Sequence, residues 1–495
     1  MPEPNIAPPA PRRERWIALA IVLGIVAARS AVFLIRPESY FDSDQAIVGL
    51  MAKHIAELRA FPVFFYGQTY MLGVEAWLAA PLFVVAGPSA TALKLPLLVM
   101  NGTIAVLLLR TFEREMGLRP TAAAAASLLF ILPAPGLAAI FMGSTGGSVE
   151  PLLYVLLLWV TRHRPLWCGI VFGIGFLNRE FTVYGIVALA CIEALERTLF
   201  TRAGAARFAR IIAVAAVVWL AVQGLKNVSS GSGPGTTSAQ TFAASNNIMG
   251  LVARICGSPA MALSGAGRLF SVHWPALLGT APLPLTAFSI ESRVAQGLPG
   301  ASWLPLLFVI LSVAGIAIAP RSSPPRFSQY LMIVGLVSIV GYLSGRCGVV
   351  SFFTLRYELL SLLGLVGLAG WFLAVRAPRA WRLAWMTTLA LWIAVLAIPH
   401  VRLVAEYLRD PPVPAKRQLI DVLRSQRIRY GTADYWIAYY IDFMTNERMV
   451  FASTGPTRIL LYDAIVANHA AQAVVLSRQP CDGGILLIPG VYQCP

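Results

Sequence analysis

Long apolar runs separated by short arginine clusters make up most of this 495-residue sequence. Hydrophobic residues form 57% of the chain and charged residues 13%, whereas soluble domains carry about 25% charged residues. A membrane-spanning helix needs roughly 17 to 25 apolar residues. We therefore expect an α-helical polytopic protein of the lipid bilayer with about eleven transmembrane helices, in the runs at 16–35, 91–110, 121–141, 149–161, 166–178, 181–196, 208–225, 303–320, 328–345, 357–375 and 383–400.

The basic residues predict the orientation of these helices. The formal net charge is +16, but the arginines form clusters between apolar runs and not one extended face, so we expect no nucleic-acid partner. With the N-terminus in the cytoplasm, every cytoplasmic connection carries arginines, as the positive-inside rule requires. These clusters are Arg110/Arg114/Arg119, Arg162/Arg164, Arg197/Arg202/Arg207, Arg321/Arg326 and Arg376/Arg379/Arg382.

One apolar segment, 71–85, is not counted as a span. Counting it would turn every later arginine cluster outward, and its Gly73, Glu75 and Pro81 suit a re-entrant or surface segment. The first outer loop then covers 36–90, and a longer outer loop covers 226–302. Residues 1–400 form the predicted transmembrane domain.

The composition changes at Val401, where polar and aromatic residues become more frequent. Short helix-like and strand-like segments follow, so we expect residues 401–495 to form a small soluble α/β domain on the outer side. Cys481 and Cys494 are the only cysteines in this part. In an exported domain, this pair is expected to form a disulfide, which would contribute about 3 kcal/mol for a loop of this length.

The first outer loop begins with two aspartates, Asp42 and Asp44, next to an apolar run. Apolar residues at 47, 51, 55 and 58 recur with helical spacing, which predicts a short helix lying on the membrane surface. Aspartate is a preferred capping residue and is favoured by the dipole at a helix N-terminus. The pair either caps this helix or takes part in chemistry.

Further ionisable residues lie at the outer ends of apolar runs, where an unpaired charge is unfavourable. Carboxylates beside arginines suit a reaction in which a carboxylate accepts a proton from a hydroxyl while arginines hold a phosphate leaving group. Glycosyl transfer from a lipid phosphate is one such reaction. The residues are Glu75, Glu150, Arg179, Glu180, Arg346, Arg356 and Glu358.

The same residues also have structural explanations. Glu75 and Glu150 could be buried partners of outer arginines, and Arg346 and Arg356 could snorkel to the membrane interface. His273, which precedes a Trp-Pro pair, is either a base or an interface residue. The aromatic run at 435–440 could stack on a sugar acceptor or pack in a core.

The order of these features resembles the membrane glycosyltransferases of the GT-C class over roughly residues 16–400. The similar branch is that of protein mannosyltransferases and aminoarabinose transferases, which is glycosyltransferase family 39-like. Glu150 matches the acidic second outer loop of that branch. The other matching pieces are Phe41-Asp42-Ser43-Asp44-Gln45-Ala46, the apolar segment ending at Gly87, Leu93-Lys94-Leu95-Pro96 and Arg356-Tyr357.

This resemblance implies roles for single residues. Asp44 matches the catalytic base best by position and Asp42 second, although the branch usually has Asp-Glu where this chain has Asp44-Gln45. The donor phosphate would be held by Arg356, with Arg346 or Arg179. We expect substrate contacts from Glu150 and Tyr357, which match the family, and also from Glu75 and His273, which we select for their chemistry alone. Two carboxylates at Asp42 and Asp44 could hold a divalent Mg or Mn ion.

The sequence thus predicts an inverting membrane glycosyltransferase. The resemblance implies a polyprenyl-phosphate sugar donor and a lipid, glycan or protein acceptor. It also implies a place in the inner membrane of a bacterium, with the site facing the periplasm or cell exterior. The alternatives are a transporter or flippase of lipid-linked sugars and a non-catalytic membrane assembly subunit. A transporter would show charges near span centres and paired halves, which this sequence does not.

Overall fold

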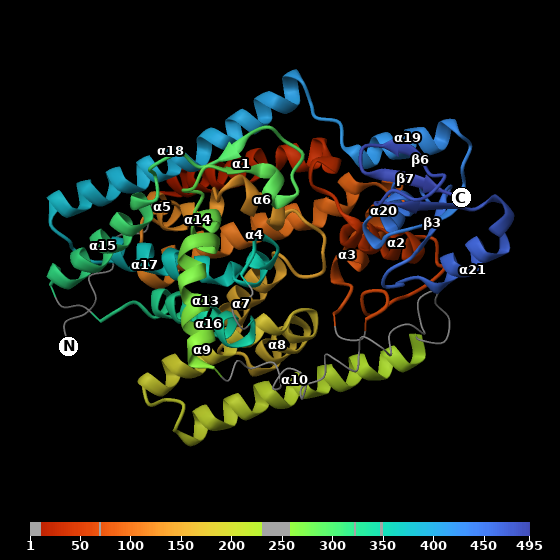
Figure 1. Ribbon diagram of the computed structural model, residues 1–495. Helices are drawn as coiled ribbons and strands as arrows, with labels where there is room; N and C mark the ends of the chain where they lie inside the picture. Colours follow the sequence, from red (N-terminus) through yellow and green to blue (C-terminus); the bar gives the residue numbers. More distant parts are fainter. Residues whose placement is uncertain (1–10, 69–70, 230–257, 321–322, 347–349) are drawn as a thin grey trace.

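The computed structural model describes residues 11–68, 71–229, 258–320, 323–346 and 350–495. A bundle of apolar helices is followed by a small α/β domain, which lies at one end of the bundle beside α2 and α3 (Figure 1). The elements as far as the gap at 230–257 are α1 (Arg12–Ile35), η1 (Pro37–Tyr40), α2 (Ser43–Ala56), α3 (Val74–Ala86), α4 (Ala90–Met116), α5 (Pro120–Ile131), α6 (Pro135–Phe141), α7 (Glu150–Thr161), α8 (Pro165–Asn178), η2 (Glu180–Thr182), α9 (Val183–Leu195) and α10 (Arg202–Ser229).

The second half of the bundle contains short turns as well as long helices. Its elements are α13 (Pro259–Arg268), the π-helical turn η3 (Leu269–His273), α14 (Trp274–Leu277), β1 (Leu283–Pro284), η4 (Leu285–Phe288), β2 (Ala295–Gln296), α15 (Trp303–Ile318), α16 (Arg326–Arg346), η5 (Phe352–Tyr357), η6 (Leu359–Ser361), α17 (Leu362–Ala374) and α18 (Arg379–Arg409).

Each predicted apolar run coincides with one of these helices, except 121–141, which holds both α5 and α6. Among the described residues, five helices are long and apolar enough to cross a membrane, namely α1, α4, α10, α16 and α18. The pair α5 and α6 is a sixth candidate, bent by 87°. Pro133 lies in this bend and has no N–H to continue the helical ladder. The count of about eleven spans stays a prediction, since α7, α8, α15 and α17 are apolar but shorter.

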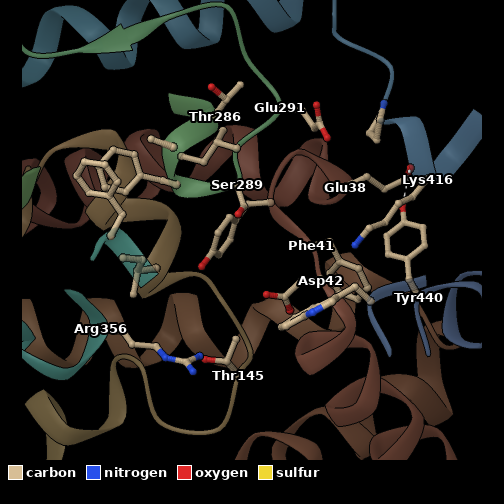
Figure 2. A pocket seen from close by; sticks show the side chains of 18 of the residues that line it. Glu38, Phe41, Asp42, Thr145, Thr286, Ser289, Glu291, Arg356, Lys416 and Tyr440 are labelled. Atoms are coloured by element: carbon tan, nitrogen blue, oxygen red, sulfur yellow. Dashed lines mark hydrogen bonds between the residues drawn. The ribbon is translucent and has the colours of Figure 1, made fainter. Parts of the chain in front are cut away.

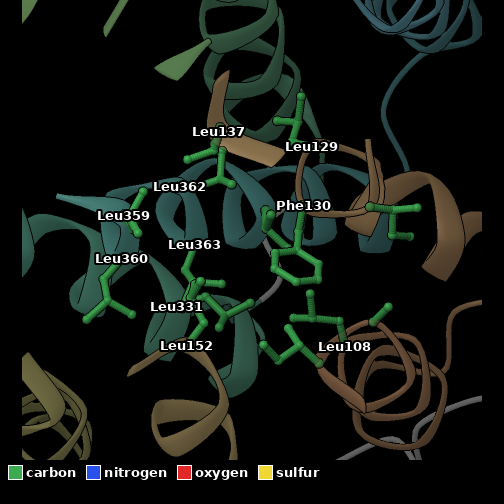
Figure 3. Packing of buried hydrophobic residues seen from close by; sticks show 14 of the residues in the cluster. Leu108, Leu129, Phe130, Leu137, Leu152, Leu331, Leu359, Leu360, Leu362 and Leu363 are labelled. Atoms are coloured by element: carbon green, nitrogen blue, oxygen red, sulfur yellow. The ribbon is translucent and has the colours of Figure 1, made fainter. Parts of the chain in front are cut away.

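The core of the bundle forms where α4, α5, α7, α16 and α17 meet. Leu108, Phe130, Leu152, Leu331 and Leu363 converge there and are almost completely buried (Figure 3). Burying a leucine or phenylalanine side chain contributes about 1.5 to 3 kcal/mol. This packing fixes the ends of the helices from which the polar loops emerge.

Helix α2 is not the surface helix that the apolar spacing predicts. Its apolar residues Ile47 and Met51 are fully buried, and so are Lys53 and His54 on its polar face. The polar face is covered by the C-terminal domain, which the one-sided pattern could not reveal. Only the last stripe position, Leu58, is exposed, and it lies two residues beyond the end of α2.

Helix α3 occupies the segment that was not counted as a span. It has 13 residues, which at 1.5 Å per residue gives about 20 Å, short of a hydrocarbon core of about 30 Å. It packs between α2 and α4.

The C-terminal domain is built on a five-stranded sheet of order β4-β3-β5-β7-β6. Strand β3 is parallel to both β4 and β5, and β7 is antiparallel to β5 and β6. The predicted α/β class is therefore correct, but the predicted start at Val401 lies inside α18, which continues to Arg409. The elements are α19 (Ala415–Ser425), β3 (Tyr430–Ala433), α20 (Tyr435–Met444), β4 (Val450–Ser453), α21 (Leu460–Asn468), η7 (Ala470–Gln472), β5 (Val474–Ser477), β6 (Ile485–Ile488) and β7 (Val491–Cys494).

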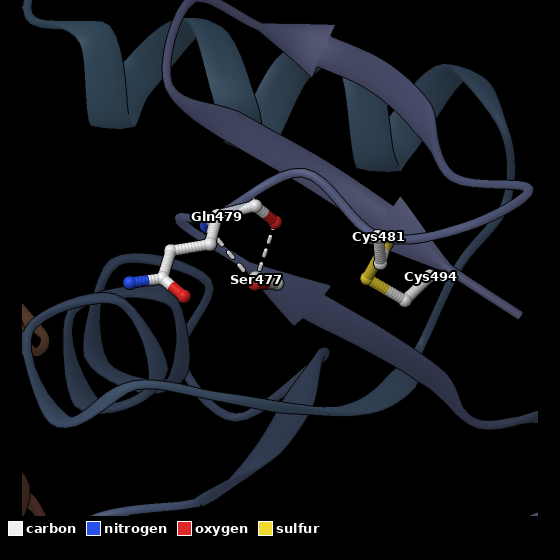
Figure 4. The surroundings of a disulfide bond; sticks show 4 residues. All are labelled: Ser477, Gln479, Cys481 and Cys494. Atoms are coloured by element: carbon white, nitrogen blue, oxygen red, sulfur yellow. Dashed lines mark hydrogen bonds between the residues drawn. A yellow bond between two sulfur atoms is a disulfide. The ribbon is translucent and has the colours of Figure 1, made fainter.

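A disulfide joins Cys481 to Cys494, with the two Cα atoms 5.9 Å apart (Figure 4). The bond ties the turn before β6 to the end of β7. It therefore closes the last hairpin of the chain.

Candidate functional site

A cavity of about 530 Å³ lies where the bundle meets the C-terminal domain. Four segments of the bundle and three of the C-terminal domain line it, so no single loop forms the site. The lining residues are Glu38, Tyr40, Phe41, Asp42, Ile140, Thr145, Ser148, Thr286, Ala287, Phe288, Ser289, Ile290, Glu291, Phe352, Arg356, Pro414, Lys416, Trp436, Tyr440 and Arg478. Volumes of about 300 to 1,000 Å³ are typical of small-molecule sites.

Asp42 lies between the two walls of this cavity. Its Oδ1 accepts a hydrogen bond from the backbone N–H of Gln45 at 3.0 Å, so it is the N-cap of α2. Figure 2 shows its carboxylate in the space between Arg356 and Lys416. Burial, followed by the charge of Asp44, raises the pKa of Asp42, while the Gln45 amide and the two cations oppose this shift.

Asp44 is engaged with neighbours and does not line the cavity. The phenol of Tyr435, in the C-terminal domain, donates to its Oδ1 at 2.6 Å. Its Oδ2 lies 3.9 Å from Nη1 of Arg356. Asp42 thus faces the cavity, whereas Asp44 contacts an arginine and a tyrosine.

Lys94 fixes the turn that leads into Asp42. Its Nζ donates to the backbone carbonyls of Pro37 at 2.8 Å and Tyr40 at 2.6 Å, and the side chain is fully buried. The ammonium also lies 5.7 Å from the ring centroid of Phe41. The sequence motif containing Lys94 drew attention to this residue, but not to this role.

Arg356 is the only one of the three predicted phosphate-binding arginines that lines the cavity among the described residues. It belongs to η5, and its Nη2 donates to the phenol oxygen of Tyr357 at 3.1 Å. Figure 2 places its guanidinium next to Thr145. Tyr357 packs edge-on against Phe181 outside the cavity lining. Arg346 ends α16, and its side chain lies outside the described residues.

Three side chains outside the cavity lining lie next to the second loop (142–149). They belong to Arg179, Glu75 and Glu150. Nε of Arg179 donates to the carbonyl of Gly146 at 2.7 Å. Glu75 Oε2 accepts from Ser144 Oγ and from the Gly146 N–H, each at 2.9 Å. These side chains hold the loop whose Thr145 and Ser148 line the cavity.

Glu75 and Glu150 are both completely buried and lie next to each other. Glu150 Oε2 accepts from the Val149 N–H at 3.0 Å, and no donor within the described residues reaches its Oε1. Burial, followed by the neighbouring Glu150, raises the pKa of Glu75. Both residues were predicted to contact substrate, but neither lines the cavity.

His273 is also buried away from the cavity. Its Nδ1 lies 2.7 Å from Glu358 Oε2, and its Nε2 lies 2.8 Å from the carbonyl oxygen of Ser351. Trp274 Nε1 donates to the other oxygen of Glu358 at 3.0 Å. The histidine therefore anchors η3 to the two ends of η5, which carries Arg356.

The described residues do not supply a complete set of ligands for a divalent cation. Asp42 and Asp44 offer hard carboxylate oxygens, but both oxygens of Asp44 face other groups. No group of three or more His, Cys, Asp or Glu that could hold a metal occurs within the described ranges.

The wall contributed by the C-terminal domain was not predicted as a site. Lys416, Trp436, Tyr440 and Arg478 reach the cavity from α19, α20 and the end of β5. The only signal for them was the aromatic run at 435–440. Lys416 and Arg478 carry no motif, and only the fold brings them beside Asp42.

A helical membrane bundle with a polar cavity between its loops and a small α/β domain has the architecture of the GT-C class, and the predicted resemblance is confirmed at the level of the fold. No family model and no curated protein matches the sequence. Among solved structures, the apo oligosaccharyltransferase of Archaeoglobus fulgidus matches with a TM-score of 0.51 and 12% identity, over 94% of this chain and 70% of that chain. The same enzyme in complex with Zn and sulfate gives 0.52 and 12%, over 93% and 67%. ArnT from Cupriavidus metallidurans bound to undecaprenyl phosphate gives 0.40 and 14%, over 93% of each chain.

Proposed function

We propose that this protein is a membrane glycosyltransferase that moves a sugar from a polyprenyl-phosphate donor to an acceptor hydroxyl. The observation that carries the proposal is the position of Asp42, whose carboxylate lies in the cavity between two cationic walls. The fold similarity supports the class of enzyme. The cavity would open to the periplasm or cell exterior, on the side where the positive-inside rule puts the first loop.

In the proposed reaction, Asp42 accepts the proton of the acceptor hydroxyl. The hydroxyl oxygen forms a bond to the anomeric carbon, and the bond from that carbon to the phosphate oxygen breaks on the opposite face. The configuration is inverted, and the electron pair leaves on the polyprenyl phosphate. A base with a raised pKa accepts a proton more readily than an ordinary aspartate.

Arg356 would hold the leaving phosphate, because its guanidinium lines the cavity. Asp44 and Tyr357 would keep that guanidinium in place, through the 3.9 Å approach to Asp44 and the hydrogen bond to the Tyr357 phenol. Charge-assisted bonds of an arginine to phosphate are about twice as strong as neutral hydrogen bonds. The negative charge that develops on the leaving phosphate therefore lies beside a guanidinium that the fold already orients.

The test uses the purified full-length protein in lipid nanodiscs with a panel of polyprenyl-phosphate sugars and acceptors. Release of polyprenyl phosphate is measured. We expect release by the wild type and a loss of about 10²- to 10⁴-fold in Asp42→Asn, the range typical of a general base. Asp44→Asn should lose less, and Asp482→Asn, which alters an exposed carboxylate outside the cavity, should lose nothing.

Undiminished turnover in Asp42→Asn would remove the base from the proposal. Movement of the lipid-linked sugar across the bilayer without release of lipid phosphate would instead support a transporter. Neither result would follow from a misfolded variant if gel filtration and thermal unfolding match the wild type.

A further inference from the structure

The cavity has a cation on each of its two walls. Arg356 reaches it from η5 of the bundle, and Lys416 reaches it from α19 of the C-terminal domain. Figure 2 shows the Lys416 ammonium directed toward Asp42 from the side opposite Arg356. The proposed reaction uses only one of these cations, for the leaving phosphate.

Lys416 differs from its neighbours on α19 because no carboxylate of the described residues forms a close ion pair with it, although the charge of Asp42 acts on it from across the cavity. Arg417 pairs with Glu38 at 3.4 Å, and Arg424 pairs with Asp421 at 3.2 Å. Within the described parts of the chain, no carboxylate oxygen lies within 4.0 Å of the Lys416 ammonium, which instead lies 5.0 Å from the Tyr440 ring centroid. Burial lowers the pKa of Lys416, so a bound anion would stabilise its charged form.

Arg478 stands on the same wall and is already oriented. Asp434 accepts from its Nε at 2.5 Å and from its Nη2 at 3.2 Å. A guanidinium has five N–H donors, so the remaining Nη1 stays free of this pair and can serve a ligand. Asp434 is also the N-cap of α20, which fixes the pair to the helix that carries Trp436.

Trp436 adds an aromatic surface to this cationic wall. It lines the cavity, is partly exposed and packs edge-on against Tyr435, with ring centroids 5.1 Å apart. An indole offers a large apolar face with a polar N–H, which suits the C–H face of a sugar ring. The wall thus combines two cations with one aromatic face.

Two carboxylates of the bundle also line the cavity and limit what can bind. Glu38 is paired with Arg417 and accepts from the Tyr440 phenol at 3.5 Å, so its charge is partly met. Glu291 is exposed at the rim of the cavity and can accept hydrogen bonds from sugar hydroxyls. One anionic group near Lys416 is therefore favoured, whereas a second one near Glu291 would be repelled.

We propose that the acceptor is an anionic saccharide, whose phosphate or carboxylate binds Lys416 and Arg478 while its ring lies on Trp436 and its hydroxyl faces Asp42. This inference rests on the proposed function and names the acceptor class. The membrane-bundle wall with Arg356 would take the donor phosphate, and the C-terminal wall would take the acceptor anion. The C-terminal domain is then part of the acceptor site.

The test measures binding to the purified full-length protein without any donor. Saturation-transfer NMR would follow glucose 6-phosphate, glucuronate, glucose and inorganic phosphate as probes. We expect both anionic sugars to bind about tenfold more tightly than glucose, the size of one charge-assisted hydrogen bond. The phosphate and carboxylate probes show which anion the site prefers.

Variants separate the two parts of the wall. Lys416→Met and Arg478→Gln should each remove most of the preference for anionic sugars, and Trp436→Ala should weaken glucose and glucose 6-phosphate alike. Arg424→Gln is the matched control, because Arg424 is exposed on the same helix and outside the cavity. It should bind all probes like the wild type.

Three results would overturn the inference. They are equal binding of glucose and the anionic sugars, an anion preference that survives in the Lys416→Met/Arg478→Gln double variant, and inorganic phosphate that competes as well as glucose 6-phosphate. Failure of the proposed function looks different, because the wild type would then release no polyprenyl phosphate while its preference for anionic sugars persisted.

Discussion

Glu75 and Glu150 form one acidic pair, next to the second loop, and Asp42 and Asp44 form another, at the start of α2. The two pairs differ in what surrounds their carboxylate oxygens. Glu75 accepts hydrogen bonds from a serine hydroxyl and two backbone N–H groups of the second loop, and Glu150 caps the same loop. Asp42 accepts one backbone N–H and otherwise faces the cavity. The comparison teaches that carboxylates that accept hydrogen bonds from a loop position that loop, whereas a carboxylate that faces the cavity can act in it.

The largest expected effect is on the rate of transfer, which should respond very differently to a change in each acidic pair. Asp42→Asn should lower transfer by about 10²- to 10⁴-fold, whereas Glu150→Gln, which keeps the shape of the buried pair, should stay within about tenfold of the wild type. The measurement is the initial rate of polyprenyl phosphate release. Equal losses in both variants would show that the distinction between the pairs is wrong.

The next largest effect is on stability. Here the change in the Glu75/Glu150 pair should cost more than the change at Asp42. Glu75→Ala removes the acceptor of three hydrogen bonds around the second loop and should destabilise the fold by about 1 to 3 kcal/mol. Asp42→Asn should be neutral or stabilising at pH 7, since Asn is an equally good helix cap.

The sign for Asp42 follows from its raised pKa. A carboxyl whose folded pKa lies above its unfolded value contributes stability at low pH, and this contribution is lost as the pH rises through the folded pKa. At pH 7, well above the unfolded-state pKa of a carboxyl, the raised pKa of Asp42 therefore lowers stability, and Asn removes that effect. Thermal unfolding at pH 5 and pH 7 checks this, and a large loss in Asp42→Asn at pH 7 would contradict it.

A third effect is a shift in the pH profile. Activity needs ionised Asp42, so it should fall as the pH drops through a pKa above the ordinary value of about 3.9. Asp44→Asn removes the neighbouring negative charge and should move this acid limb to lower pH. Lys416→Met removes a neighbouring cation and should move it to higher pH.

The measurement is the midpoint of the acid limb of kcat/KM, which does not depend on the overall rate of each variant. The control is Asp482→Asn, whose limb should coincide with that of the wild type. Shifts of the same sign in Asp44→Asn and Lys416→Met would contradict the electrostatic account.

The smallest expected effect is that of metal removal. Both oxygens of Asp44 already contact Tyr435 and Arg356 rather than a site shared with Asp42, so we expect a chelator to leave the rate of transfer unchanged. The rate is measured in EDTA and after re-addition of Mg or Mn. A loss that either ion restores would show that Asp42 and Asp44 hold a metal after all.

The fold was largely predictable because hydrophobic length and arginine placement act locally along the chain. Each predicted run contains a helix, and the segment at 71–85 that was left out of the spans contains the 13-residue α3, which is no shorter than α7. The placement of α2 was not predictable, because the face with Lys53 and His54 is buried by Glu447 from the other end of the chain. Such long-range ion pairs leave no periodic signal.

The site was predictable only in part for the same reason. Asp42 and Arg356 stood out because charge at the end of an apolar run needs an explanation. Their neighbours Lys416 and Arg478 sit in an ordinary polar domain, where a basic residue is common. Their importance comes from tertiary contact, and one sequence does not encode that contact visibly.

The contact between α2 and α20 decides how this protein could be altered. A Cβ at Gly49 would lie 2.4 Å from the Phe443 ring, and Phe41 stacks on that ring at 5.5 Å, so the two helices fit closely. Together with the Tyr435–Asp44 hydrogen bond, this packing joins the first loop and the C-terminal domain into one structural unit. A chimera designed to take over the acceptor preference of another protein would need both segments, 36–68 and 410–495, from that protein. Transplanting one segment alone would bring together α2 and α20 surfaces that do not fit each other.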